Sequence, residues 1–124
     1  MKTKFYNHIV QLQKAMCEEF EKIDGKARFF EDKWTREGGG GGITKIIEDG
    51  KVIEKGGVNI SKVFGELPQS MQKQLNTKSN KFFACGLSLV IHPINPMVPT
   101  VHANWRYFET VSYTHLTLPT ILLV

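Results

Sequence analysis

The sequence predicts an α+β domain in which one amphipathic helix precedes a series of β-strands. Apolar residues recur every three or four positions over residues 5–23, which is the period of one helix face. After that segment, short β-rich runs alternate with Gly, Pro and Asp-Gly turns, as expected for strands joined by hairpins. With 124 residues, the chain is long enough for one small domain with a modest core.

The N-terminal helix is defined by an apolar stripe and a glycine stop. Gly25 suits a helix C-cap, so we expect the helix to end near Asp24. The stripe either packs against the chain's own sheet or binds a partner, and packing within the domain is the favoured interpretation. The stripe consists of Phe5, Ile9, Leu12, Met16, Phe20 and Ile23.

Strands are expected on both sides of Asp49 and Gly50, a dipeptide that favours a tight hairpin turn because glycine accepts positive φ. The pair Gly56 and Gly57 is expected to break the second strand, with residues 58–67 continuing as an extended segment. The other expected elements are an extended segment at residues 28–34, a short helix that begins at Pro68, a polar turn at residues 78–81 and a strand at residues 82–92 that is buried on both faces.

Five consecutive glycines occupy residues 38–42. They do not form a P-loop, because no Lys-Ser/Thr pair follows, and they lack the G-x-G-x-x-G order of a dinucleotide-binding turn. Two interpretations remain open. The run is either a flexible linker or a place where bare backbone closely approaches a flat ligand.

Composition excludes several functional classes. The formal charge is +4 and the pI is about 9.1, but the basic residues alternate with acidic ones, so we expect no nucleic-acid partner. The N-terminus lacks a signal-peptide core, and no run approaches the length of a membrane span. Cys17 and Cys85 fit no metal or redox spacing, and two buried free thiols are favoured over a disulfide. We therefore expect a cytoplasmic protein.

Residues 86–109 are the most informative segment, because they predict two strands with their polar side chains in phase. Side chains alternate across a strand, so each strand should present its polar residues on one face. If the strands pair as a hairpin across the proline-containing loop, the two sets can share one side of the sheet. The sets are Ser88, Val90 and His92 on the first strand, and His102, Asn104, Arg106 and Phe108 on the second.

These residue types suit proton transfer and the binding of an acid. His92 and His102 can transfer protons near neutral pH or bind a metal, although two imidazoles make an incomplete metal site. The alternative is a pair of hydrogen-bonded histidines at a sheet margin. Arg106 can grip a carboxylate with two hydrogen bonds or form a salt bridge within the protein.

Ser88 and the two tryptophans have more modest expected roles. Ser88 lacks the setting of a nucleophile, and a hydroxyl that hydrogen-bonds a ligand fits better. Trp34 and Trp105 are interpreted as packing residues. Trp105 lies in the opposite phase to Arg106 and should point to the other face of the sheet.

Residues 111–124 differ from the rest of the chain, because every Asp, Glu, Lys and Arg lies within residues 1–110. The segment VSYTHLTLPT at residues 111–120 resembles the translated end of a transposase-based sequencing adapter, whose codons GTC TCT TAT ACA CAT CTG ACG CTG CCG ACG would give the same ten residues. We interpret the segment as a non-native tail, and the alternative is an ordinary apolar C-terminal strand. Ser112, Tyr113 and His115 are therefore not offered as site residues.

Three segments together closely resemble the family of oxygen-dependent coproporphyrinogen III oxidases of haem biosynthesis. They are EDKWTRE at residues 31–37, which leads into the glycine run, GVN at residues 57–59, and GLSLVIHPINPMVPTVHANWRYFE at residues 86–109. The resemblance extends from the first helix to about Glu109. It implies that residues 1–110 are the N-terminal part of a single longer domain, and that residues 111–124 are the non-native tail.

The resemblance also implies a fold, a reaction and a set of roles. The fold would be a large antiparallel sheet flanked by helices on both sides, in a homodimer. The reaction would use molecular oxygen to convert two propionates of coproporphyrinogen III to vinyls, with release of carbon dioxide and formation of protoporphyrinogen IX. His102 would be the proton donor, and His92 and His102 would be metal ligands in those members that bind a divalent metal. The substrate contacts would be Ser88, Asn104, Trp105 and Arg106.

The implied chemistry needs no organic cofactor if the electron-rich pyrrole itself reacts with oxygen, so the protein has to position oxygen and steer a proton. We expect the truncated chain to be inactive alone. A second function, from a different class, is a non-catalytic module that binds a tetrapyrrole or another anion with the same face. A third alternative is a fragment without function.

Overall fold

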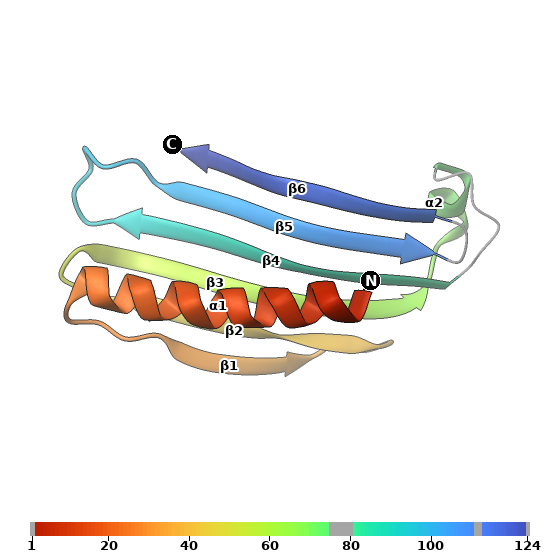
Figure 1. Ribbon diagram of the computed structural model, residues 1–124, viewed down its shortest axis with the longest axis horizontal. Coiled ribbons are helices and arrows are strands. Elements are labelled where there is room, and N and C mark those ends of the chain that lie inside the picture. The colour runs from red at the N-terminus through yellow and green to blue at the C-terminus, as the bar shows by residue number, and fades with distance from the viewer. Residues whose placement is uncertain (1, 75–80, 111–112, 124) are drawn as a thin grey trace.

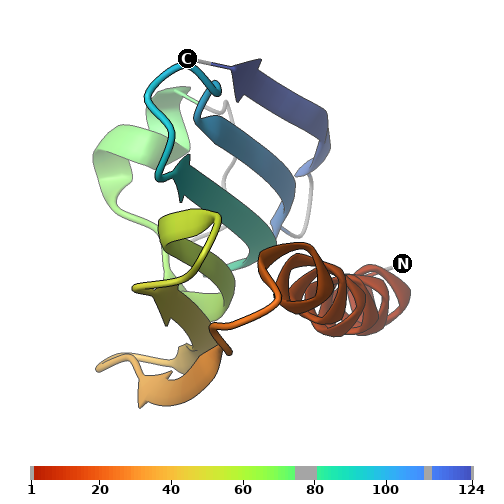
Figure 2. The ribbon, with the colours of Figure 1, turned by 90° about the vertical axis from the view of Figure 1, so that its left-hand side faces the viewer.

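The computed structural model describes residues 2–74, 81–110 and 113–123, the last of these as backbone only. Within these residues, a six-stranded sheet has the strand order β1-β2-β3-β4-β5-β6, and each strand pairs antiparallel with the next. The long helix α1 lies against one face of the sheet (Figures 1 and 2). The elements are α1 (Lys2–Asp24), β1 (Phe30–Thr35), β2 (Gly40–Glu48), β3 (Ile53–Glu66), α2 (Gln69–Gln74), β4 (Lys81–Pro93), β5 (Val101–Thr110) and β6 (Tyr113–Leu123).

The predicted α+β class, antiparallel sheet and N-terminal helix are confirmed. Helix α1 ends at Asp24, and Gly25 has a φ of 78° and donates its N–H to the carbonyl oxygen of Glu21 over 2.9 Å, as a helix C-cap does. The short helix α2 follows Pro68, as expected. Most of the polar turn expected at residues 78–81 lies outside the described residues, and Lys81 is the first residue of β4.

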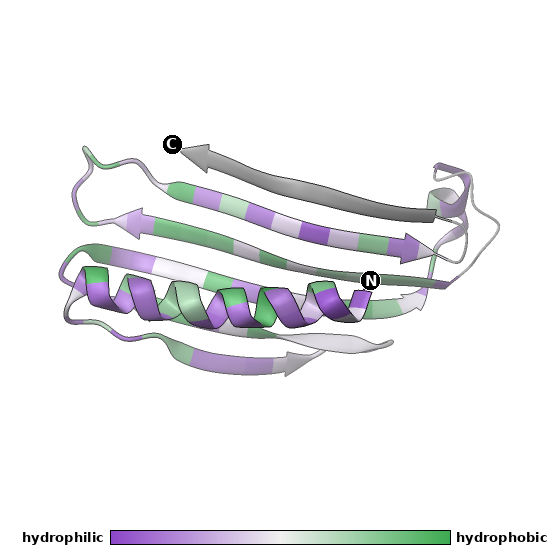
Figure 3. Cartoon of the chain, in the orientation of Figure 1, coloured by the Kyte–Doolittle hydropathy of each residue, from purple (hydrophilic) through white to green (hydrophobic). Residues whose placement is uncertain are grey.

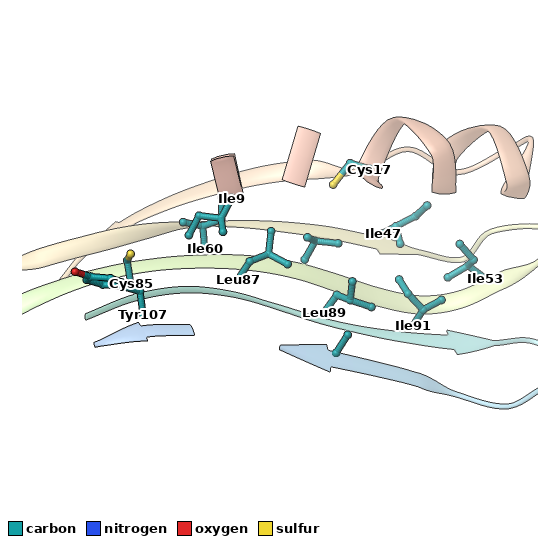
Figure 4. Close-up of a cluster of buried hydrophobic side chains, with 12 residues drawn as sticks. Ile9, Cys17, Ile47, Ile53, Ile60, Cys85, Leu87, Leu89, Ile91 and Tyr107 are labelled. Atoms are coloured by element: carbon teal, nitrogen blue, oxygen red, sulfur yellow. The ribbon is translucent and has the colours of Figure 1, made fainter. Parts of the chain in front are cut away.

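The core lies between α1 and the sheet, as Figure 4 shows. The stripe residues Phe5, Ile9, Leu12, Met16 and Phe20 pack in or against this core, which confirms packing within the domain for them, whereas Ile23 is 60% exposed. Figure 3 shows apolar positions interspersed with polar ones along the helix. The buried core residues are Ile9 and Cys17 from α1, Ile47 from β2, Ile53, Val58 and Ile60 from β3, Cys85, Leu87, Leu89 and Ile91 from β4, and Ala103 and Tyr107 from β5.

Strand β4 is buried on one face only, so the expectation of burial on both faces is wrong for this chain. From Cys85 to Ile91, alternate residues are buried under α1, whereas Ser88 and Val90 are half-buried. An antiparallel sheet with a helix on one side commonly produces this pattern.

Strand β3 runs without interruption through Gly56 and Gly57, so the expected break is wrong. The residue at position 56 has no space for a side chain, because a Cβ there would approach the Ile91 side chain to 2.8 Å. The irregularity in β3 instead lies between Ile53 and Lys55, where the register with β4 shifts.

The glycine run is ordered, so the flexible-linker interpretation is wrong. Gly39 and Gly40 have φ values of 133° and 94°, a region that glycine tolerates, and β2 begins at Gly40. At Gly42, a Cβ would collide with the ring of Trp34 and with the backbone carbonyl of Ile60. The glycines therefore allow β2 to pass directly under the indole.

The side chain of Asp24 connects the end of α1 to the turn between β2 and β3. It is 1% exposed and accepts hydrogen bonds from five backbone N–H groups, at distances of 2.8–3.3 Å. Burial alone would raise the pKa of Asp24, but backbone N–H donors hold that pKa well below its usual range. The donors belong to Lys26, Ala27, Lys51, Val52 and Ile53.

The hairpin turn at Asp49 and Gly50 is confirmed, although its backbone differs from the expectation. Asp49, not the glycine, has the positive φ of 56°. Gly50 is required for a different reason, because a Cβ there would collide with the carboxylate of Asp24.

The two thiols are free and buried, as predicted. Burial raises the pKa of both Cys17 and Cys85 to about 11, which keeps the thiols protonated at neutral pH. Neither described helix combines the length and the apolar character that a bilayer crossing requires.

Replacing Asp24 with Asn should destabilise the chain by about 3 kcal/mol at pH 7, because an amide cannot accept all of these N–H bonds and leaves buried donors unpaired. The control is Asp49→Asn, which changes an exposed carboxylate in the same corner and should leave stability unchanged. Urea unfolding followed by circular dichroism measures both. Equal stabilities of the two variants would contradict the structural role of Asp24.

The lowered pKa of Asp24 predicts that the stability of the parent chain depends on pH more strongly than that of Asp24→Asn. The pKa of Asp24 is lowered on folding, so its contribution is complete above the unfolded-state pKa of about 4 and is lost as the pH falls further. The parent chain should therefore lose stability on acidification below about pH 4 more steeply than Asp24→Asn does. Parallel acid-unfolding slopes would contradict this assignment.

Replacing Gly42 with Ala should cost about 1–3 kcal/mol, because the added methyl group meets the Trp34 ring and backbone that cannot move freely. The matched control is Gly57→Ala, at a strand position where the nearest atom to a Cβ is the Lys45 carbonyl oxygen at 4.0 Å. We expect that variant to stay within about 1 kcal/mol of the parent. Urea midpoints measure both, and a Gly42→Ala variant as stable as its control would contradict the proposed crowding.

Candidate functional site

The polar residues predicted to share a face do lie on one side of the sheet, opposite α1. In the register of β4 and β5, Ser88 is opposite Asn104 and Val90 is opposite His102. Residues opposite each other in an antiparallel pair point to the same face. Because Leu87 and Leu89 point toward α1, the polar set points away from it. We call this side of the sheet the polar face.

His102 and Asn104 contact each other on the polar face. The amide Nδ2 of Asn104 lies 3.3 Å from Nε2 of His102, and both residues are half-buried. With the amide nitrogen as the donor, Nε2 of a neutral His102 is the acceptor, whereas a ring N–H at Nε2 would instead donate to the amide oxygen of Asn104. In both arrangements the contact holds the His102 ring against the side chain of Asn104.

His92 lies near the end of the same face. It is exposed, it is opposite Lys55 of β3, and its Nδ1 lies 3.4 Å from Oγ1 of Thr100. On β4 it lies two residues beyond Val90, which is the residue opposite His102, and in the same phase. The hairpin therefore brings both imidazoles to one end of the polar face.

Arg106 and Ser88 have no protein partner in the described part of the chain. Arg106 is exposed and forms no ion pair there, so the alternative of an internal salt bridge is not observed among the described residues. Ser88 is half-buried, and its hydroxyl makes no hydrogen bond to another described residue. Both groups are open to a ligand.

Trp105 is the predicted site residue whose side chain is not brought together with the others. It packs against the core under α1, as its sequence phase indicated. Its backbone does reach the polar face, because its carbonyl oxygen lies so close to Gly86 that a Cβ on Gly86 would approach it to 2.8 Å.

A group of polar residues on β1, β2 and β3 was missed by the sequence analysis. Trp34 Nε1 donates to Thr44 Oγ1 over 3.1 Å, and Thr44 Oγ1 donates to Asn59 Oδ1 over 2.6 Å. The register places Asn59 directly opposite Ser88, so this chain of hydrogen bonds ends beside the predicted site. The available signal was the alternation of residues 57–61, whose polar phase matches that of β4. Trp34, interpreted as a packing residue only, also serves as a donor.

Small residues make the polar face flat around these groups. Gly57 and Ser61 flank Asn59 along β3 on this face, and Gly86 lies next to Ser88 along β4. With few side chains standing between the polar groups, a flat molecule can contact several strands at once.

A metal site is incomplete within the described residues. No three His, Cys, Asp or Glu side chains in that part of the chain gather closely enough to hold a metal ion. His92 and His102 supply at most two ligands, whereas three or four protein ligands are usual.

Comparison with known proteins identifies close relatives. A family model described as coproporphyrinogen III oxidase matches residues 4–118. The oxygen-dependent coproporphyrinogen-III oxidase of Prochlorococcus marinus strain MIT 9515 is 50% identical over 110 residues, which cover 87% of this chain and 32% of the relative. That of strain CCMP1986 is 51% identical over 110 residues, with the same coverage. Coproporphyrinogen-III oxidase 1, chloroplastic, of Arabidopsis thaliana is 42% identical over 117 residues, which cover 89% of this chain and 30% of the relative. The chain thus spans about a third of the length of the curated relatives it matches.

Proposed function

This chain belongs to the coproporphyrinogen III oxidase family, and on that premise we propose that it forms part of an enzyme that oxidatively decarboxylates coproporphyrinogen III. Two propionates become vinyls, which gives protoporphyrinogen IX. Each conversion releases carbon dioxide, one proton and two electrons, and molecular oxygen takes up the electrons together with protons. The observation that carries the proposal is the polar face, where an imidazole, an amide, a hydroxyl and a guanidinium point the same way.

The substrate suits the groups on this face. A porphyrinogen carries four propionates, and the guanidinium of Arg106 has the planar donor fork that grips a carboxylate. Ser88 and Asn104 are opposite each other and can hydrogen-bond the same ligand. Trp105 would contribute through its backbone, since its side chain packs in the core.

His102 would supply the proton. The proton would come from the imidazolium form of the ring, and the contact between Nε2 and the side-chain amide of Asn104 holds the ring in one orientation. A general acid needs a fixed direction relative to its substrate, and the Asn104 contact provides that direction.

Molecular oxygen is the co-substrate of the proposed reaction, and no organic cofactor takes part in that reaction. The electron-rich pyrrole would react with oxygen, while the protein binds and orients the ring. If a divalent metal is bound, His92 and His102 are the ligands that this segment offers, and the other ligands would come from outside it. A ring nitrogen that held the metal could not donate a proton, so the proton-donor role of His102 belongs to the metal-free ring.

The proposal includes a cytoplasmic location and a homodimer for the complete protein, without a nucleic-acid partner. The two buried free thiols support a reducing compartment. Size-exclusion chromatography with light scattering on the complete protein would test the dimer.

We also propose that residues 1–110 are the native part of the chain and that residues 111–124 derive from a sequencing adapter. The support is the match between residues 111–120 and the translated adapter, and the absence of Asp, Glu, Lys and Arg from this tail. Sequencing the genomic locus through codon 110 tests this proposal. We expect the reading frame to diverge from the present sequence at codon 111, and an unchanged frame would contradict the proposal.

Catalysis is tested in a completed protein, which joins residues 1–110 to the remaining C-terminal part of the Prochlorococcus marinus MIT 9515 relative. We expect it to consume oxygen and form protoporphyrinogen IX. Replacing His102 with Ala should lower kcat by about 100-fold or more, which is the usual contribution of a positioned general acid. The matched control is His8→Ala, because His8 is exposed on α1, away from the polar face.

The outcomes separate catalysis from binding alone. A completed protein that is folded and binds coproporphyrin III, but forms no product, would favour the non-catalytic tetrapyrrole-binding alternative. Unchanged turnover in the His102→Ala variant would reject the role of His102 as proton donor.

A further inference from the structure

The hydrogen bonds around Asn59 determine which way its amide points. The indole N–H of Trp34 is a donor only, so Oγ1 of Thr44 accepts from it and keeps its own hydrogen to donate. The distance of 2.6 Å from Thr44 Oγ1 to the Asn59 amide is typical of an O–H···O bond and short for an N–H···O bond. The amide oxygen of Asn59 therefore faces Thr44, and its Nδ2 faces away.

The amide nitrogen of Asn59 has no acceptor among the described residues, although its oxygen is fixed. Asn59 is half-buried on the polar face and lies directly opposite Ser88 of β4. Its Nδ2 offers two N–H donors beside the hydroxyl of Ser88. The Asn59 amide is half-buried and is oriented by Thr44 and Trp34, but only its oxygen is hydrogen-bonded. Its N–H groups are therefore available to an external acceptor.

The chemistry of the ligand decides what this donor can bind. The pyrrole nitrogens of a porphyrinogen carry hydrogens and act as donors, so its hydrogen-bond acceptors are the carboxylates. We propose that Asn59 is a further substrate-binding residue whose amide N–H group contacts a substrate carboxylate, and that Thr44 and Trp34 are its positioning residues. This inference rests on the proposed function, and it extends the site from the β4–β5 hairpin across β3 to β1.

The positions of Asn59 and Arg106 suit a ligand with several carboxylates. Arg106 is opposite Gly86 on β4, and Gly86 lies on the polar face two residues along the strand from Ser88, the residue opposite Asn59. Because β4 presents only Gly86 and Ser88 between them, no large side chain separates the guanidinium from the amide on this face. The two groups are two strands apart in the sheet, so they suit different carboxylates of one flat molecule.

The test compares Asn59→Ala, Asn59→Asp, Thr44→Val and Thr44→Ser in the completed protein. The readouts are KM and kcat with coproporphyrinogen III, and the Kd for coproporphyrin III, a non-reacting tetracarboxylate, measured by fluorescence. Asn59→Ala should raise KM and Kd about tenfold or more, as loss of a hydrogen bond to a charged group does, with kcat changed less than about threefold. Asn59→Asp should bind more weakly still, because it places a negative charge beside the substrate carboxylate.

The Thr44 variants separate positioning from packing. Thr44→Val has nearly the same shape but no hydroxyl, so the Asn59 amide loses its orientation, and we expect a smaller rise in KM and Kd than for Asn59→Ala. Thr44→Ser restores the hydroxyl and should restore both constants. Lys33→Ala is the control, because Lys33 is exposed on β1 next to Trp34 in sequence and points to the other face.

Each outcome decides the inference. Near-parental KM and Kd values in a folded Asn59→Ala or Asn59→Asp variant would overturn it, and so would equal constants for Thr44→Val and Thr44→Ser. If the unsubstituted completed protein binds coproporphyrin III without turning over substrate, the proposed function fails, while the Kd series still tests Asn59. If that protein is folded and does not bind coproporphyrin III, both proposals are rejected.

Discussion

The packing of α1 on the sheet is the constraint on which the direction of every group in the candidate site depends. Alternate residues of β4 and β5 are buried under α1, among them Leu87, Leu89 and Ala103. A shift of one residue in either strand would turn these side chains to the open face and bury the polar ones. The free energy of burying the apolar set therefore also specifies where the imidazole, the amide and the guanidinium point.

Polar contacts fix α1 over the sheet more exactly than apolar packing can, since hydrophobic attraction has no preferred direction. Gln13, which is 2% exposed, donates from Nε2 to the carbonyl oxygens of Ile43 and Val58, both over 2.9 Å. Asp24 fixes the C-terminal end through backbone N–H groups of the β2–β3 turn. These contacts fix the position of α1 along the sheet. The register between β3 and β4 in turn places Asn59 opposite Ser88.

Local patterns predicted most of the elements, and long-range contacts account for the errors. The stripe of α1, the turn at Asp49 and the phase of residues 86–109 depend on neighbours in sequence and were found. The need for glycine at position 56 comes from Ile91 of another strand, and the need for glycine at position 42 comes from Trp34 of β1 and Ile60 of β3. Asn59 was missed as a site residue because its orientation comes from Thr44, fifteen residues away in sequence.

The glycine run and the polar face are two consequences of the same arrangement. Gly42 lets the indole of Trp34 lie flat against β2, which brings Nε1 within 3.1 Å of the Thr44 hydroxyl. A side chain at position 42 would lift the indole and remove the donor that leaves Thr44 free to donate to Asn59. The absence of a side chain at Gly42 on β2 therefore helps to orient the amide of Asn59 on β3. In this way a glycine-rich segment that resembles a linker contributes to the geometry of the candidate site.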